Sequence, residues 1–272
     1  MVVLSSGIQS KSSKVEPHVI RIHIITEMLA LISLAAFIVS AASLCSQEYL
    51  FVLMAQILCD LHPITNMSFY LGITCAIGIL ISHPVGYLLM FLPLFHQMEF
   101  TSTALFHAPR TSAFLINHSQ AYHCAMILSI AESLIKPYVC LLIFTGCEFP
   151  TLEVLRFPAM IVLVAAQLLR STAMITCGLN FTHQISYAKQ QSHTLVTTGI
   201  YRILRHPSYT AFFYWACSLQ ILLLNPVSFI VYVALLKEFF SDRIASEEEI
   251  LCDFFDEYEE YRKRTFVLIP LI

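Results

Sequence analysis

Residues 154–182 are almost entirely apolar and contain only two charged residues, Arg156 and Arg170. About 20 consecutive apolar residues are enough for an α-helix to cross the hydrocarbon core of a bilayer. Hydrophobic residues make up 57% of the 272 residues and charged residues only 12%, whereas about 25% charged residues is usual in a soluble domain. These features predict an all-α polytopic membrane protein that lies in the lipid bilayer.

Turn residues divide the apolar sequence into eight predicted spans, some of them paired as short helical hairpins. The expected spans are residues 19–45, 49–61, 67–82, 85–98, 121–145, 154–182, 209–224 and 226–240. His83 and Pro84 separate the third span from the fourth, and Asn225 with Pro226 forms the hinge of the last hairpin. Residues 99–118 are expected to form a polar connection.

Basic residues collect at one end of these spans. They are Lys11, Lys14, Arg21, Arg110, Lys189, Arg202, Arg205, Lys237, Arg243, Arg262, Lys263 and Arg264. Under the positive-inside rule this end faces the cytosol, so both termini are expected there. We expect a cytosolic tail (1–18), N-terminal hairpins with a connecting segment (19–118) and a transmembrane core (119–272). The core would include a cytosolic loop (183–208) and a cytosolic C-terminal helix (241–272).

Charge and cysteine spacing exclude other classes of protein. The net charge of −3 argues against nucleic acid as a partner, because there is no broad basic surface to release counterions from phosphate. The nine cysteines lie mostly in apolar runs, without CxxC or Cys/His ligand spacing. We therefore expect free thiols and no metal, and leave open whether Cys45 and Cys147 pair.

A polar loop interrupts the apolar pattern at residues 192–215, SHTLVTTGIYRILRHPSYTAFFYW. Pro207 disfavours helical geometry at His206 and suits the first turn of a helix. RHPSY should therefore end the loop at a helix N-terminus, where free backbone N–H groups point outward. Such a pocket suits a small polar ligand that carries an adenine, a ribose or a carboxylate. A connector whose basic residues contact lipid headgroups is the simpler alternative.

Two arginines and a carboxylate add to this loop. Arg170 lies deep in an apolar run, where a charge is costly and usually marks a site, although a structural pair with Glu132 or Glu153 would also explain it. Arg243 and Glu247 are four residues apart and share a helix face, for which a solvated salt bridge is the alternative. Together these groups suit an anionic lipidic acceptor that meets a cationic polar donor.

These residues carry a resemblance to a known family. HTLVTTGIYRILRHPSYTAFFYW, then QILLLNP and FFSDRIASEEEILCDFFDEYEEYRKR, resemble the protein-S-isoprenylcysteine O-methyltransferase family, most strongly over residues 167–265. Phospholipid N-methyltransferases and NADPH-dependent sterol reductases share only a looser form of RHPSY. The resemblance implies methyl transfer from S-adenosylmethionine to the C-terminal carboxylate of farnesylated or geranylgeranylated CaaX-type proteins, such as small GTPases, at the endoplasmic reticulum membrane.

The resemblance also implies site residues, matched position by position. The implied cofactor-binding residues are His193, Thr194, Leu195, Val196, Tyr201, His206, Pro207, Ser208, Tyr209 and Glu247. Arg170 and Arg243 match arginines on the acceptor side, and with Glu247 they form the implied catalytic set. A glutamine of the family pattern aligns with Ser186, so this contact is left open, with Gln184 and Gln190 as nearby alternatives.

The chemistry of the acceptor limits what the site must do. An α-carboxylate has a reference pKa of about 3.5 and is ionised at cytosolic pH, so no general base is required. We expect Arg170 or Arg243 to fix the carboxylate, by a bidentate fork where geometry allows. One alternative is a phospholipid or other small-lipid methyltransferase with the same cofactor pocket. Another is a transporter or non-catalytic scaffold, which would predict an internal repeat that we do not find.

Overall fold

The computed structural model describes residues 63–116, 119–144, 153–189 and 193–272. In these parts of the chain the regular elements are helices, with one isolated parallel bridge between Leu204 and Phe266. The predicted tail, the spans 19–45 and 49–61, and both Cys45 and Cys147 lie outside the described residues. The all-α prediction is confirmed for the part that the structure describes.

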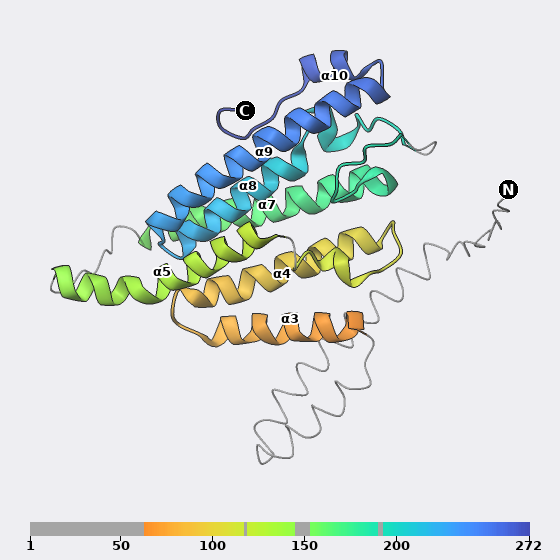
Figure 1. Cartoon of the computed structure of the whole chain (residues 1–272). Coiled ribbons are helices and arrows are strands. Elements are labelled where there is room, and N and C mark those ends of the chain that lie inside the picture. The colour runs from red at the N-terminus through yellow and green to blue at the C-terminus, as the bar shows by residue number, and fades with distance from the viewer. Residues whose placement is uncertain (1–62, 117–118, 145–152, 190–192) are drawn as a thin grey trace, which may run out of the picture.

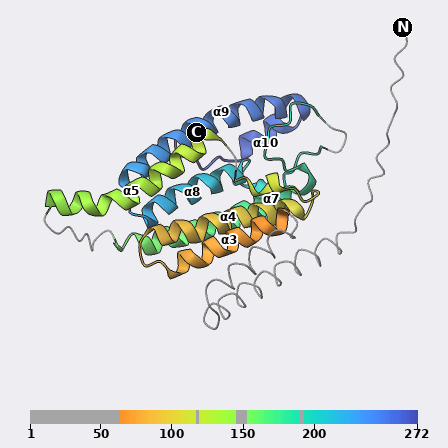
Figure 2. The ribbon, with the colours of Figure 1, turned by 60° about the horizontal axis from the view of Figure 1, so that its bottom comes forward.

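The helices lie side by side in one layered bundle (Figures 1 and 2). They are α3 (Pro63–Leu80), α4 (Val85–Ala104), α5 (Gln120–Phe144), α7 (Arg156–Cys177), α8 (Pro207–Leu222), α9 (Pro226–Phe254) and α10 (Tyr258–Arg264). Short 3₁₀ turns cover Thr111–Phe114, Gly178–Asn180 and Gly199–Arg202. Packing follows the order α3, α4, α7, α8, α9, and α5 lies against α4 and α9. This order places the two ends of the polar loop on α7 and α8.

An aromatic and aliphatic core joins α4, α7 and α8. Phe91 and Phe95 of α4 pack with Leu163 of α7 and with Trp215 and Leu219 of α8. Within the described residues, Pro63–Leu80 and Arg156–Asn180 are the two helical segments with the length and hydropathy to cross a membrane by themselves. The count of eight spans stays a prediction.

Polar side chains of α5 hold the turn between α8 and α9. The Glu132 carboxylate accepts hydrogen bonds from the backbone N–H groups of Val227 and Ser228, at 2.9 and 2.6 Å. The Asn225 side-chain amide donates to the Ser129 carbonyl oxygen at 2.8 Å. Pro226 stands at the first position of α9, where a missing N–H costs nothing. The hinge predicted at Asn225 is confirmed, and Glu132 serves it rather than Arg170.

Two predicted boundaries are wrong. Helix α4 does not end at residue 98 but continues to Ala104, because Glu99 and the polar residues after it find partners on other elements. Residues 241–272 are not one helix: α9 ends at Phe254, Phe255 is extended, and α10 folds back (Figure 1). Tyr258 of α10 is buried after this turn. Burial of this aromatic side chain stabilises the turn in preference to a longer α9.

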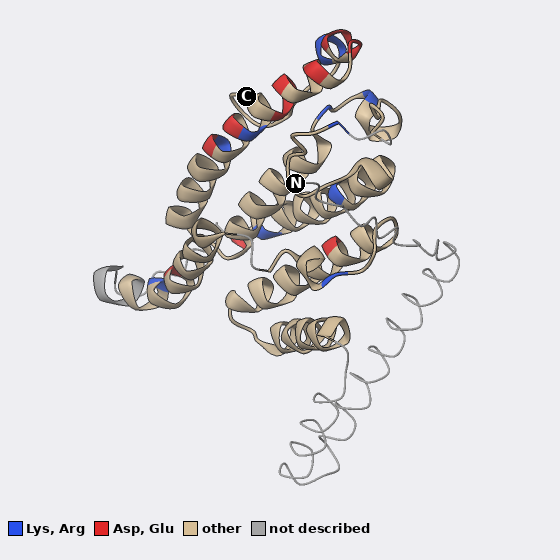
Figure 3. Cartoon of the chain, turned by 45° about the vertical axis from the view of Figure 1, so that its right-hand side comes forward, with Lys and Arg blue, Asp and Glu red and all other residues tan. Residues whose placement is uncertain are grey.

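Charged side chains are sparse on α3, α4 and α8 and gather on the second half of α9 and on α10 (Figure 3). Glu249, Asp253 and Glu257 are exposed there. Carboxylates exposed in this number require water. The second half of α9 and α10 therefore form the aqueous end of the bundle.

A pair of glycines sets the contact between α3 and α4. A Cβ atom on Gly78 would lie 2.6 Å from the Met90 backbone nitrogen and 2.7 Å from the Gly86 carbonyl oxygen. We expect Gly78→Ala to lower the free energy of unfolding by about 1–3 kcal/mol, because backbone atoms must move apart. Thermal unfolding in detergent measures this. Gly72→Ala, where no atom lies within 4 Å, is the control, and equal stability of the two variants would contradict the prediction.

Candidate active site

Helix α7 holds the polar loop that leads to RHPSY. The Asn180 side-chain amide oxygen accepts a hydrogen bond from the Thr194 backbone N–H at 2.9 Å, and its NH₂ group donates to the Thr194 hydroxyl at 3.2 Å. The Tyr201 hydroxyl donates to the Ala173 carbonyl oxygen at 3.3 Å. Gly199 has a φ of +57°, a conformation that glycine adopts without strain. The loop is therefore held at Thr194 by the turn that follows α7 and at Tyr201 by α7 itself.

The C-terminal segment closes over the same loop. Arg205 donates to the Glu248 carboxylate at 2.5 Å and to the Thr265 carbonyl oxygen at 2.8 Å. His206 Nε2 lies 3.2 Å from the same carboxylate oxygen of Glu248. Burial acts to raise the pKa of Glu248, but the hydrogen bonds and charges of His206 and Arg205 outweigh it and lower this pKa to about 2. This ion pair joins the loop to α9 and to the C-terminal segment.

The lowered pKa predicts acid sensitivity. The ordinary pKa of Glu248 is 4.5, so its stabilising effect is complete above that pH and is lost as pH falls towards about 2. We expect the unfolding temperature of the wild-type protein to fall more between about pH 5 and about pH 3 than that of Glu248→Gln. Glu249→Gln, at an exposed neighbour, should behave like the wild type. The same acid response in Glu248→Gln would contradict this prediction.

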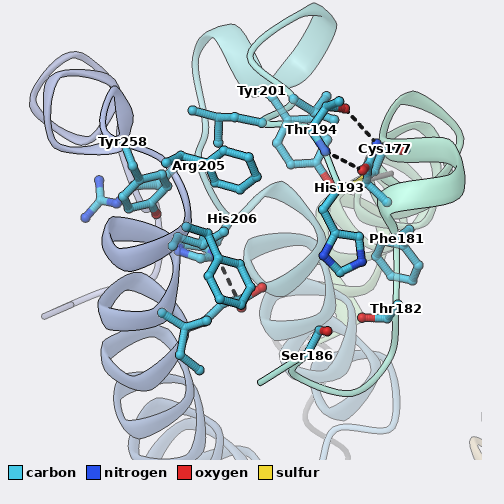
Figure 4. Close-up of a pocket in the computed structure, with 18 of the residues that line it drawn as sticks. Cys177, Phe181, Thr182, Ser186, His193, Thr194, Tyr201, Arg205, His206 and Tyr258 are labelled. Carbon is cyan, nitrogen blue, oxygen red and sulfur yellow. Dashed lines mark hydrogen bonds and ion pairs between the residues drawn. The ribbon is translucent and has the colours of Figure 1, made fainter. Parts of the chain in front are cut away.

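A first cavity of about 160 Å³ lies between the loop, α7, α9 and α10 (Figure 4). All ten sequence-predicted cofactor residues line it: His193, Thr194, Leu195, Val196, Tyr201, His206, Pro207, Ser208, Tyr209 and Glu247. Ser186 also lines it, whereas Gln184 does not and Gln190 lies outside the described residues. In Figure 4, His206 and Tyr258 lie on one side of the cavity and His193 and Phe181 on the other. Their roles remain predictions.

A second cavity of about 60 Å³ lies beside the first and is mainly aromatic. Its lining includes Phe95, His96, Tyr122, Phe212, Phe239 and Phe240, together with Arg170 and Arg243. Phe181, Thr182, Ser208 and Tyr209 line both cavities. A larger chamber, lined by the loop and the aqueous end of α9, and a smaller aromatic chamber among the helices therefore share one wall.

Arg170 pairs with Glu99 and not with Glu132 or Glu153. Its Nε donates to Glu99 Oε1 at 2.5 Å and its Nη2 donates to Glu99 Oε2 at 2.8 Å. Its Nη1 donates to the Ser208 hydroxyl at 3.0 Å and to the Ser208 carbonyl oxygen at 3.1 Å. Glu153 instead pairs with Arg156. Arg170 is thus tied to α4 and to the wall between the cavities.

Arg243 and Glu247 share a helix face as predicted, but Tyr209 joins them. Arg243 Nε donates to the Tyr209 hydroxyl oxygen at 2.9 Å, and that hydroxyl donates to Glu247 Oε2 at 2.6 Å. Arg243 Nη2 also donates to the His183 carbonyl oxygen at 2.7 Å. The partners found for Arg243 in the described part of the chain are therefore uncharged.

Two parts of the site are not predicted from the sequence. Glu99 falls in the polar connection expected for residues 99–118, although it is the one acidic residue between positions 61 and 131, and this isolation in apolar sequence is a usable signal. The aromatic lining from α9 and α10 includes Phe254, Tyr258 and Tyr261. No local motif indicated that these rings would turn towards the loop.

Comparisons with known proteins agree with this architecture. The model of the isoprenylcysteine carboxyl methyltransferase family matches residues 159–253. The chain is 37% identical over 227 residues to protein-S-isoprenylcysteine O-methyltransferase of Schizosaccharomyces pombe, covering 75% of this chain and 93% of that protein. It is 34% identical over 220 residues to the human protein of the same name, covering 78% and 75% of the two chains. The solved eukaryotic intramembrane Ras methyltransferase superimposes with a TM-score of 0.76 at 26% identity and covers 93% of this chain and 97% of that one.

The all-helical fold is thus that of an intramembrane methyltransferase. The chain belongs to the isoprenylcysteine carboxyl methyltransferase family. The resemblance seen in the loop and the SEEE segment is confirmed, and so is the predicted class of enzyme, a carboxyl methyltransferase acting on isoprenylcysteine.

Proposed function

We propose that this chain transfers the methyl group of S-adenosylmethionine to the C-terminal carboxylate of farnesylated or geranylgeranylated CaaX-type proteins. The acceptors would include small GTPases, and the site would face the cytosol at the endoplasmic reticulum membrane. The observation that carries the proposal is the wall that the two cavities share, to which Ser208 and Tyr209 contribute. A soluble donor and a lipidic acceptor come from different solvents, and this wall is where the chamber under the polar loop meets the aromatic chamber among the helices.

The residues of the first cavity fit S-adenosylmethionine. The Tyr258 hydroxyl is buried and has no hydrogen-bond partner among the described residues, so it has a donor to offer. Helix α8 begins at Pro207, which leaves the backbone N–H groups of Ser208 and Tyr209 at its start without helical partners. Glu247 supplies a carboxylate for the cationic part of the molecule. When bound, S-adenosylmethionine would supply the methyl group, held by the loop, α8 and Glu247.

Arg243 is the group that we assign to the acceptor carboxylate. The sequence left Arg170 and Arg243 as alternatives, and their partners favour Arg243. Glu99 already occupies the guanidinium fork of Arg170, whereas the hydrogen bonds of Arg243 within the described residues go to neutral oxygens. Charge-assisted hydrogen bonds from Arg243 would orient the carboxylate oxygen towards the shared wall.

The surrounding aromatic rings position both reactants. The Tyr209 ring stacks on His206 at 5.4 Å and on Phe240 at 5.2 Å between centroids, so the wall is held by packing on both sides. The rings of Phe95, Phe212 and Phe239 suit a prenyl chain that enters from lipid. Alignment of two bound reactants is worth roughly 7–11 kcal/mol of barrier. We therefore assign the chain's contribution to positioning and exclusion of water, with no proton transfer by a side chain.

Transfer of radiolabelled methyl by the purified protein in liposomes tests this function. N-acetyl-S-farnesylcysteine and phosphatidylethanolamine would be supplied together with labelled S-adenosylmethionine. We expect label in the farnesylcysteine ester. Label only in phospholipid would contradict the proposed acceptor and favour a lipid methyltransferase. No label in either would contradict the proposal as a whole.

A further inference from the structure

Glu99 is a carboxylate in the interior of the bundle that the proposed chemistry does not use directly. It is fully buried in α4, and no other Asp, Glu, Lys or Arg lies in that helix. An unpaired charge in such a place costs several kcal/mol. The bidentate pair with Arg170, at 2.5 and 2.8 Å, satisfies both carboxylate oxygens. Arg170 lines the second cavity, so this charged pair lies at the cavity wall.

The pair determines what Arg170 can offer to an incoming acceptor. All three guanidinium nitrogens of Arg170 donate to Glu99 or Ser208. The rings of Phe95 and Phe212 lie 5.3 Å from its central carbon. Its charge is balanced by Glu99, so a second carboxylate in the cavity gains little from it. Arg243 is left as the cation that can attract the acceptor.

The same pair also supports the shared wall. Arg170 Nη1 holds both the hydroxyl and the carbonyl oxygen of Ser208, a residue that lines both cavities. One turn later on α4, the Thr103 hydroxyl lies 3.2 Å from His183 Nε2, and the His183 carbonyl oxygen accepts a hydrogen bond from Arg243. Helix α4 therefore supports the wall through Glu99. Through Thr103 and His183 it also supports Arg243, the cation assigned to the acceptor carboxylate.

We propose that Glu99 is a positioning residue for methyl transfer. It holds Arg170 against Ser208 and balances the charge of Arg170, so that the acceptor carboxylate stays at Arg243. The inference rests on the proposed function and assigns a role within that site. Without the charge of Glu99, the Arg170 fork would be free in the same cavity and would compete with Arg243 for the carboxylate. The acceptor would still bind, but out of line with the methyl donor.

Steady-state kinetics of Glu99→Gln in liposomes test the proposal. We expect kcat per folded protein to fall about tenfold or more, the KM for N-acetyl-S-farnesylcysteine to be unchanged or lower, and the KM for S-adenosylmethionine to stay within about threefold. The neutral carboxamide of the acceptor, used as an inhibitor, should bind less well relative to the carboxylate than it does in the wild type. A role in folding alone would move neither this charge preference nor kcat per folded protein.

Two further variants keep the test decisive. The double variant Glu99→Gln with Arg170→Gln removes both buried charges. It should fold even if Glu99→Gln alone, which leaves Arg170 without its charged partner, does not. We expect it to lose the added preference for carboxylate, while its kcat stays well below that of the wild type because Arg170 no longer holds Ser208. Glu132→Gln, which weakens the start of α9, should lower stability without changing the kinetics of the folded protein.

Several outcomes would overturn the inference. They are a kcat of Glu99→Gln within about twofold of the wild type, or an acceptor KM raised about tenfold at unchanged kcat. An unaltered preference for carboxylate over carboxamide in Glu99→Gln would also overturn it. If Glu99→Gln does not fold, a kcat of the double variant within about twofold of the wild type would overturn it instead. Absence of transfer by the wild-type protein would overturn the proposed function itself, so the two failures are distinguishable.

Discussion

Replacing Arg243 by Ala is expected to lower kcat/KM for N-acetyl-S-farnesylcysteine by about 30-fold or more. Removing one partner of a hydrogen-bonded charge pair in a desolvated site costs about 2–5 kcal/mol, and each 1.4 kcal/mol is about tenfold in rate. The loss should appear with the carboxylate acceptor and not in the affinity for S-adenosylhomocysteine. Tyr209 would lose the hydrogen bond that it accepts from Arg243 but would still donate to Glu247.

The matched control for this variant is Arg202→Ala. Arg202 is also on the aqueous side but is exposed and lines neither cavity. Its replacement should leave kcat/KM within about twofold. Radiolabel transfer over a range of acceptor concentrations measures both variants. Equal kcat/KM for Arg243→Ala and the wild type would contradict the assignment of Arg243 to the acceptor carboxylate.

Replacing Arg170 by Lys is expected to lower kcat about 100-fold, with S-adenosylhomocysteine affinity within about fivefold of the wild type. Lysine keeps the charge but has a single nitrogen, so it cannot hold both oxygens of Glu99 and also reach Ser208. The wall between the cavities would lose its support while most residues of the first cavity keep their places. Single-turnover kinetics and calorimetric titration separate these two effects.

Arg156→Lys is the control for Arg170→Lys, because Arg156 is on the same helix but pairs at its far end with the exposed Glu153. Its effect on kcat should be small. A kcat of Arg170→Lys near that of the wild type would contradict the role of the guanidinium fork. An equal loss in both variants would indicate general damage to α7 instead.

Local sequence grouped correctly the residues that line the first cavity, because most of them follow one another along one loop. His193 through Tyr209 lie within one loop and the start of α8, and the Pro207 ring sets where that helix begins. Glu247 lines the same cavity because the helical period of α9 turns its side chain to that face. Such relations depend on short-range geometry and can be read without knowledge of tertiary packing.

The partner of Arg170 could not be predicted in this way. Glu99 is 71 residues distant in sequence, and the pair forms only because α4 packs against α7. The polar residues after position 98 indicated a helix end, but hydrogen bonds to other elements let α4 continue. Likewise, the pattern of residues 241–272 favours one helix, whereas burial of Tyr258 and Tyr261 over the cavity turns the chain back. Tertiary contacts overrode local preference in both places.

An experimental structure with S-adenosylhomocysteine and N-acetyl-S-farnesylcysteine bound together would test the central claim most directly. We predict that the nucleoside lies in the first cavity and the carboxylate contacts Arg243 in the second. The sulfur and a carboxylate oxygen should face each other across Ser208 and Tyr209, with the pair of Glu99 and Arg170 intact. A carboxylate bound in the fork of Arg170, or a nucleoside outside the first cavity, would contradict this account.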